Sequence, residues 1–235
     1  MPLPKVSSPT FSFKLPSTGK DVVFRPFLVK EEKSLLVAME SKDLDHMQRA
    51  MIEVLSECIM SEGVDVKKLP MFDLEYLFLK IRSKSVSEKV TLNYRHVDGI
   101  NYEGKECSIV TPVEIDLEEV EVKFREDHKS TIELTDKLVL KMRYPSFVDT
   151  VVGEINDELD LIARCIEAVY DDDEIYEPDN LEEAKQFIGS LNSQQFLKVM
   201  QFFETMPTLE HTVTYKCTGC GQDDTIVLRG LSDFF

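Results

Sequence analysis

The residues best suited to chemistry are two cysteines near the C-terminus, in the segment Cys217-Thr-Gly-Cys220-Gly. A CxxC followed by glycine lets a tight turn aim both sulfurs at one point, because Gly221 can adopt a positive φ. Such a knuckle is the first half of a zinc-ribbon pattern, in which cysteine thiolates bind Zn²⁺. A structural zinc site needs four ligands, so two more must come from elsewhere in the chain.

Two upstream residues, His96 and Cys107, are the best candidates for the missing ligands. They stand at the two ends of a polar, glycine-containing loop between two expected strands. His211 is closer in sequence, but in an extended strand it would lie about 20 Å from Cys217. The four residues that would close one tetrahedral site for a structural zinc ion are His96, Cys107, Cys217 and Cys220.

Two other interpretations of these cysteines stay open. The two hairpins could be ribbon-shaped without any metal, with side-chain packing as the source of stability. The CxxC could also form a disulfide or serve redox chemistry, although no βαβ context surrounds it. The other cysteines, Cys58 and Cys165, fall on apolar faces of expected helices and are predicted to be small core residues.

The elements that must position these residues are predicted from hydrophobic periodicity. The expected segments are an N-terminal β-hairpin at 1–30, a helical segment at 31–85, a β-meander at 86–145, a helical insert at 146–207 and a ribbon-like hairpin at 208–235. Runs of helices that alternate with runs of strands indicate an α+β fold rather than a doubly wound parallel sheet. We therefore expect antiparallel hairpins and a meander, two helical clusters and a C-terminal zinc-ribbon-like hairpin, in one or two compact domains.

Within the helical insert, apolar residues at three-and-four spacing predict one helix from residue 146 to about residue 170. The acidic sequence that follows, DDDEIYEPDN, lacks the central glycine and the twelfth-position Glu of a calcium loop, so we expect a solvated loop. Asn180 and Glu183 fit a capping box for the next helix, and Ser193 is expected to cap the last one.

The net charge of −17 limits the classes of partner. Phosphate backbones and anionic membranes attract basic surfaces, so we expect no nucleic acid and no membrane as partner, and a basic protein surface instead. No apolar run is long enough to cross a membrane, and the N-terminus lacks the apolar stretch of a signal peptide. Five irregularly spaced cysteines are typical of a reducing cytosol.

The sequence offers no positive case for an enzyme. It contains no glycine-rich phosphate loop, GxSxG, HExxH or kinase motif, and none of its four histidines lies near a Ser or Cys in a nucleophile context. We therefore predict no catalytic residues and no cofactor apart from a structural zinc ion. A zinc-dependent enzyme or a zinc-ribbon adaptor is the alternative of another class, and the acidic charge argues against it.

Apolar stripes on two expected helices and the aromatic C-terminus are candidate partner-binding surfaces. Methionine side chains adapt to varied partners, although a methionine stripe is often simply core. Two terminal aromatics would lie exposed unless they pack or dock. The candidate partner-binding residues are Met47, Met51, Phe196, Phe203, Phe234 and Phe235.

Three segments resemble the baseplate hub assembly proteins of T4-type contractile-tailed phages. They are residues 1–41, with LPSTGK and FRPFLVKEEK, residues 80–88, KIRSKSVSE, and residues 215–235, with YKCTGCG and LRGLSDFF. Residues 95–210 match in layout more than in motif. The resemblance implies a viral protein made in the cytoplasm of an infected bacterium, with a role in building the baseplate hub.

Two roles are compatible with this resemblance. The first is an assembly chaperone that binds other hub proteins or tape-measure proteins and leaves before the particle is complete. The second is a permanent minor subunit of the hub, present in the virion tail baseplate. A chaperone would hold an apolar segment of its partner in an adaptable groove, whereas a subunit would use large obligate interfaces.

Overall fold

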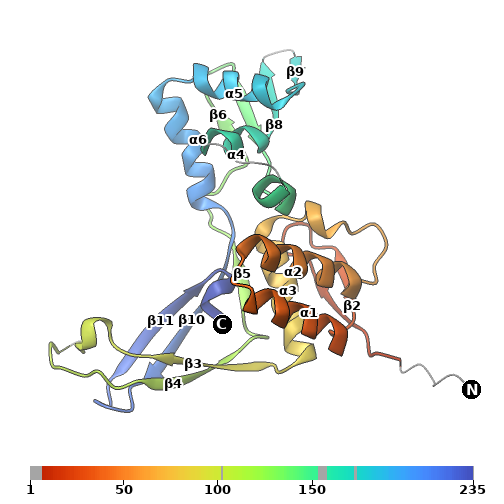
Figure 1. The fold of residues 1–235 in the computed structure, drawn as a ribbon. Coiled ribbons are helices and arrows are strands. Elements are labelled where there is room, and N and C mark those ends of the chain that lie inside the picture. The colour runs from red at the N-terminus through yellow and green to blue at the C-terminus, as the bar shows by residue number, and fades with distance from the viewer. Residues whose placement is uncertain (1–6, 102, 153–157, 172–173, 235) are drawn as a thin grey trace, which may run out of the picture. The chain divides into compact units, whose positions relative to one another are not determined.

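A computed structural model describes residues 7–101, 103–152, 158–171 and 174–234 (Figure 1). The fold is α+β with antiparallel sheets, as the sequence predicts. In chain order the strands and helices are β1 (Phe11–Lys14), β2 (Asp21–Phe24), α1 (Val29–Glu40), α2 (Leu44–Cys58), α3 (Met71–Ser85), β3 (Lys89–Tyr94), β4 (Thr111–Asp116), β5 (Glu121–Lys123), β6 (Thr131–Glu133), β7 (Val139–Met142), α4 (Glu158–Arg164), β8 (Ile166–Asp171), β9 (Glu174–Tyr176), α5 (Leu181–Ser190), α6 (Ser193–Thr205), β10 (Thr208–Lys216) and β11 (Asp223–Arg229). Short helical turns occur at Val66–Lys68, Val97–Gly99, Val148–Val152 and Leu231–Phe234.

The chain divides into two compact units. The first comprises Met1–Val64, Phe72–Lys123 and Thr208–Phe235, and the second comprises Asp65–Met71 and Phe124–Pro207. The first unit thus contains the N-terminal hairpin, helices α1 to α3 and both hairpins that carry the candidate metal ligands. The second unit contains strands β6 to β9 and helices α4 to α6.

The N-terminal part of the first unit follows the sequence prediction closely. Strands β1 and β2 form the expected antiparallel hairpin, and Asp43 caps α2 by accepting the backbone N–H groups of the first turn. The first turn of α1 is fixed by Glu31, whose carboxylate accepts the N–H of Leu28 at 2.6 Å and pairs with Arg25 at 2.8 Å. Because Glu31 is buried, this ion pair anchors the start of the helix.

The β part of the first unit consists of two antiparallel sheets. Strand β3 pairs with β4, and strand β10 lies between β11 and β5. Their apolar faces contribute to one core, together with Leu79 of α3 and the buried Phe234. The sequence pattern predicts a strand over Cys107–Val113, but β4 begins at Thr111, so Cys107 lies in the loop before the strand.

The second unit is built on a four-stranded antiparallel sheet in the order β6-β7-β8-β9. Its core contains side chains from strands β6, β7 and β8 and from helices α4, α5 and α6, so the helices pack against the sheet. The buried residues include Leu140, Met142, Ile162, Val199 and Phe202. This core is apolar and continuous, as expected for an α+β layer arrangement.

The predicted single helix from residue 146 to about 170 is wrong at its C-terminal end. Helix α4 ends at Arg164, and Ile166–Asp171 form strand β8, which pairs with β7. Ile162, Ile166 and Val169 fit helical spacing, but Ile, Val and Tyr also favour strands, and cross-strand pairing decides the outcome. Residues 153–157 lie outside the described part of the chain.

Two smaller expectations in the second unit also change. The acidic segment after residue 170 was expected to be a loop, but Glu174–Tyr176 form the edge strand β9, paired with β8. Asn180 caps α5 as predicted, whereas the cap of α6 is Asn192 rather than Ser193. The Asn192 side chain accepts the N–H groups of Gln194 and Gln195 at 3.0 Å.

No helix within the described residues is long and apolar enough to cross a membrane.

Candidate metal centre

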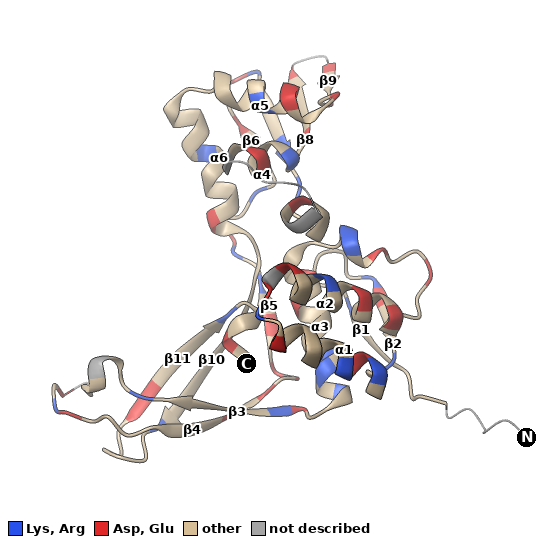
Figure 2. Cartoon of the chain, in the orientation of Figure 1, with Lys and Arg blue, Asp and Glu red and all other residues tan. Residues whose placement is uncertain are grey.

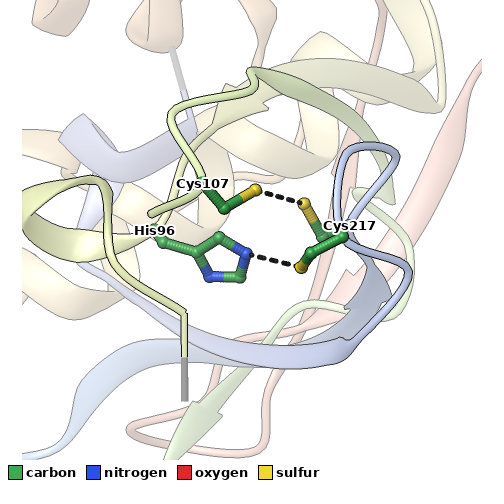
Figure 3. A group of neighbouring side chains, drawn as sticks. His96, Cys107 and Cys217 are labelled. Carbon is green, nitrogen blue, oxygen red and sulfur yellow. Dashed lines mark hydrogen bonds between the residues drawn. The ribbon is translucent and has the colours of Figure 1, made fainter. Parts of the chain in front are cut away.

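Four side chains from two hairpins meet at one point of the first unit. His96 lies two residues after the end of β3, Cys107 precedes β4, and Cys217 and Cys220 lie in the turn that joins β10 to β11. One ligand atom from each of the four residues lies within 4.8 Å of the ligand atoms of the other three (Figure 3). The structure thus gathers the four residues that the sequence singles out as a candidate ligand set.

The knuckle that carries Cys217 and Cys220 is a tight turn closed by two main-chain hydrogen bonds. Cys217 donates its N–H to the carbonyl of Gln222 at 2.8 Å, and Gly221 donates to the carbonyl of Cys217 at 2.9 Å. Gly221 has a φ of +73°, which a residue with a side chain rarely adopts. The sequence expectation for this glycine is therefore confirmed.

Gly219 has a different role, because it sits where the two hairpins approach each other. A Cβ atom at this position would lie 2.6 Å from a side-chain carbon of Ile109 and 3.1 Å from the Cys107 sulfur. Only a residue without a side chain allows the knuckle to pack this closely on the upstream loop. Thr111 strengthens the contact, since its hydroxyl accepts the N–H of Thr218 at 3.1 Å.

Two distances inside the cluster are close to those of a tetrahedral metal site. The sulfurs of Cys107 and Cys217 are 3.7 Å apart, and the Cys220 sulfur is 3.4 Å from Nε2 of His96 (Figure 3). A zinc ion with its usual bond lengths separates two thiolate sulfurs by about 3.8 Å and a sulfur from an imidazole nitrogen by about 3.6 Å. The four donors therefore need to move little to close around an ion.

The imidazole of His96 is oriented from its far side by a carboxylate. Its Nδ1 lies 3.0 Å from Oδ2 of Asp224, and the Tyr215 hydroxyl donates to the same oxygen at 3.2 Å. When Nδ1 carries the proton and donates it to Asp224, the lone pair of Nε2 points at the cluster. A carboxylate behind a ligating histidine is the usual second partner in zinc sites, where it fixes the tautomer and the ring orientation.

Main-chain N–H groups favour the thiolate form of both knuckle cysteines. The N–H groups of Cys220 and Gly219 lower the pKa of Cys217 to about 6, and the N–H of Gln222 lowers the pKa of Cys220. The thiolate is the form that binds metal. The centre thus combines a preformed geometry with two knuckle cysteines that favour the thiolate.

The fold and this site can be compared with known proteins. A family model described as T4 bacteriophage base plate protein matches residues 8–235. This chain belongs to that family. A relative, the "Baseplate hub assembly protein gp26" of Enterobacteria phage T4, is 22% identical over 229 residues, which cover 96% of this chain and 97% of the relative. No solved structure matches the chain.

The resemblance noted in the sequence is thereby confirmed at the level of the family. The chain is a phage baseplate protein, and the relative's match over nearly its full length means that both units are included in the comparison.

The other cysteines of this base plate protein are core residues, as the sequence predicts. Cys58 and Cys165 are fully buried. Burial raises the pKa of Cys58 to about 11 and that of Cys165 to about 12. Neither thiol has the solvent exposure of a reactive cysteine.

The structure places the candidate partner-binding residues in varied surroundings. Met47 and Met51 are half-buried on α2, and Phe196 and Phe203 pack partly buried against the core of the second unit. Phe234 is fully buried in the core of the first unit, so its ring serves folding. Phe235 lies outside the described residues.

Two contributors to the metal centre had no signal in the sequence. Asp224 is one acidic residue among many, and only the register of β10 and β11, which pairs it with Tyr215, brings it behind His96. In the sequence Gly219 looks like an ordinary turn glycine, because its role depends on contact with Ile109 from the distant hairpin.

Proposed function

We propose that this protein is a non-enzymatic assembly factor for the hub of a phage tail baseplate and acts as a chaperone for hub or tape-measure proteins. The observation that supports the proposal most strongly is the match to a hub assembly protein over almost the whole of both chains. On this proposal the protein works in the cytoplasm of the infected cell.

An exposed apolar stripe on α1 supports a chaperone role. Val29, Leu36 and Met39 stand seven and three residues apart, which places them on one side of the helix, and each is at least half exposed. Exposed apolar side chains in such an arrangement are typical of a surface that receives an apolar segment of a partner. We infer that this stripe covers an aggregation-prone segment until assembly.

The stripe can be tested with serine variants in an assembly assay. Leu36→Ser with Met39→Ser should lower the yield of complete baseplates in infected cells while the protein still folds. Val86 is a similarly exposed apolar residue outside the stripe, so Val86→Ser is the matched control. Equal yields from the stripe variant and the control would contradict a role for α1.

The alternative role is a permanent minor subunit of the hub. Quantitative mass spectrometry of purified particles beside the lysate of infected cells separates the two roles. We expect abundant protein in the lysate and none in particles. A fixed number of copies in each particle would refute the chaperone role and establish a structural subunit.

We also propose that the candidate metal centre binds one structural zinc ion. The proposal is supported by four protein donors at tetrahedral spacing, which leave no open position for water or substrate. A closed ligand set of this kind favours a structural ion over a catalytic one. The zinc ion would join the two hairpins as a zinc-ribbon-like element.

Metal analysis of the purified protein tests this proposal directly. Protein prepared without chelators should contain about one equivalent of zinc, and the Cys217→Ser variant should contain far less. Cys58→Ala removes a cysteine outside the cluster and serves as the control, which should keep its zinc. Wild-type protein that is folded but holds well under one equivalent would contradict the proposal.

A further inference from the structure

The second unit contains an apolar pocket that lies apart from the candidate metal centre. It has a volume of about 290 Å³ and lies between strand β8, the residues at the end of β9 and helix α5. Its walls include Ile166 and Val169 from the sheet and Ala184 and Phe187 from the helix. All of its lining residues belong to the second unit.

The polar groups around this pocket are largely engaged already. The Tyr176 hydroxyl donates to the carboxylate of Glu174 at 2.7 Å, and the carboxylate of Glu183 accepts the N–H of Asp179 at 2.7 Å. A pocket for a polar small molecule usually presents several convergent donors and acceptors. This pocket instead offers apolar walls, and its volume suits one large apolar side chain.

The rim of the pocket is strongly acidic. Glu177 and Glu183 line it directly, and the neighbouring described segment 174–183, EIYEPDNLEE, contains no lysine or arginine (Figure 2). The next basic residue, Lys185, is paired with the buried Asp160 at 2.5 Å. The rim therefore carries an excess of negative charge that a basic partner would neutralise.

An exposed strand edge borders the same pocket. Within the described residues β9 pairs with β8 alone, which leaves its other edge free. Ile175 and Tyr176 on this strand are both exposed, with Ile175 at 64%. A partner segment that enters the pocket would thus find further apolar contact beside it.

We propose that this pocket is a docking site for a basic segment of another protein. The segment inserts one leucine- or phenylalanine-sized side chain between the sheet and α5 and sets flanking lysines or arginines against Glu177 and Glu183. A second copy of this chain is a poor occupant, because a net charge of −17 on each copy makes the copies repel. The inference stands apart from the chaperone and zinc proposals, and its failure leaves both of them in place.

A random peptide library displayed on yeast and sorted against the full-length protein tests the proposal. We expect enriched peptides to carry a large apolar residue flanked by lysine or arginine. The binding position of an enriched peptide is then mapped by methyl NMR of Ile166, Val169 and Ala184. Saturable shifts at these methyl groups are the expected result.

Matched variants separate specific docking from general attraction to an acidic protein. Glu177→Lys should weaken the binding of the enriched peptide about tenfold or more, since it reverses the charge at the rim of the pocket. Glu204→Lys makes the same charge change at an exposed position of α6 that does not line the pocket, and it should have little effect. Replacement of the apolar residue of the peptide by alanine should abolish the methyl shifts.

Several outcomes would overturn the proposal. These are a library without enrichment, enriched peptides that lack basic residues, equal effects of the two lysine variants, or unchanged binding of the alanine peptide. Concentration-dependent shifts of the same methyl groups without any peptide would assign the pocket to self-association instead.

Discussion

The ribbon-like region of the first unit (residues 89–116 and 208–229) and the second unit reach a defined structure by different means. In the ribbon-like region, loops from two distant hairpins meet at His96, Cys107 and the knuckle cysteines. Large apolar side chains near this meeting point, including Val97, Ile100 and Ile109, remain exposed. In the second unit, apolar side chains from three strands and three helices fill a continuous buried core.

The difference shows what each region needs for stability. The second unit buries enough apolar area to offset the conformational entropy lost on folding. The strands of the ribbon-like region share the core of the first unit, but its loops leave apolar side chains exposed. Segments that bury little apolar area commonly depend on a metal or a disulfide. We therefore expect metal removal to affect the ribbon-like region and core mutations to affect the second unit.

The largest effect is expected from loss of a ligand. Cys217→Ser should abolish metal binding and unfold the loops around the cluster, because structural zinc contributes about 10 kcal/mol in small metal-dependent domains. Circular dichroism during heating should show an early transition that the wild-type protein lacks. Cys58→Ala is the control, and an identical melting curve for Cys217→Ser and wild type would contradict the expectation.

A core mutation should act on the second unit alone. Phe202 is 2% exposed and stacks near Tyr144, with ring centroids 5.7 Å apart. Phe202→Ala should lower the free energy of unfolding by about 3–5 kcal/mol and leave the metal content unchanged. Chemical denaturation measures the loss, and Leu197→Ala, at an exposed position of the same helix, should cost less than about 0.5 kcal/mol. A loss of bound metal in Phe202→Ala would contradict independence of the two regions.

An intermediate effect on stability is expected at the start of α1. The ion pair there depends on neither the candidate metal centre nor the core of the second unit. The hydrogen-bonded Arg25 guanidinium lowers the pKa of Glu31 from its usual 4.5 to about 2. The stabilisation is complete above pH 4.5 and is lost as the pH falls towards 2, because the folded state then has to take up the proton.

Glu31→Gln tests this ion pair. At neutral pH the variant should be about 2 kcal/mol less stable than wild type, and the difference should shrink on acidification. Denaturation at a series of pH values measures it, with the exposed neighbour variant Glu32→Gln as control. A difference that stays constant down to pH 2 would refute the assigned role.

The smallest effect is expected from a change at Asp224, which contacts the far side of the His96 ring. Asp224→Asn keeps the shape of the side chain but removes the charge that orients His96, so zinc affinity should fall about 10- to 100-fold while the protein still folds. Competition with a chromophoric chelator measures the affinity. Asp223→Asn removes the adjacent charge and should have no comparable effect, so equal losses in the two variants would argue against orientation by Asp224.

The sequence predicted the composition of the candidate site better than its surroundings. Cysteines, a histidine and turn glycines can be recognised from the local sequence, so the four candidate ligands could be proposed without knowledge of the fold. Asp224 and Gly219 act through contacts between hairpins that lie far apart in sequence. Such contacts depend on strand register, and the hydrophobic pattern alone does not specify the register of two strands that lie far apart in the sequence.

The fold class was predictable, whereas element identity failed where two periodicities overlap. Alternating runs of helices and strands gave the α+β class. The apolar positions of 162–169 suit both a helix and a half-buried strand, and pairing with β7 selects the strand from Ile166 onwards. Burial of Phe234 likewise results from long-range packing on the sheets of the first unit, which no local signal reveals.

Hydrogen-exchange mass spectrometry of the full-length protein, with and without a strong zinc chelator, tests the central claim most directly. We expect chelation to remove protection from the loops at residues 95–110 and 217–222 and to leave residues 131–142 and 181–205 as protected as before. Protection that is unchanged in both regions, or lost equally from both, would contradict a ribbon-like region held by metal and a second unit that packs independently of it.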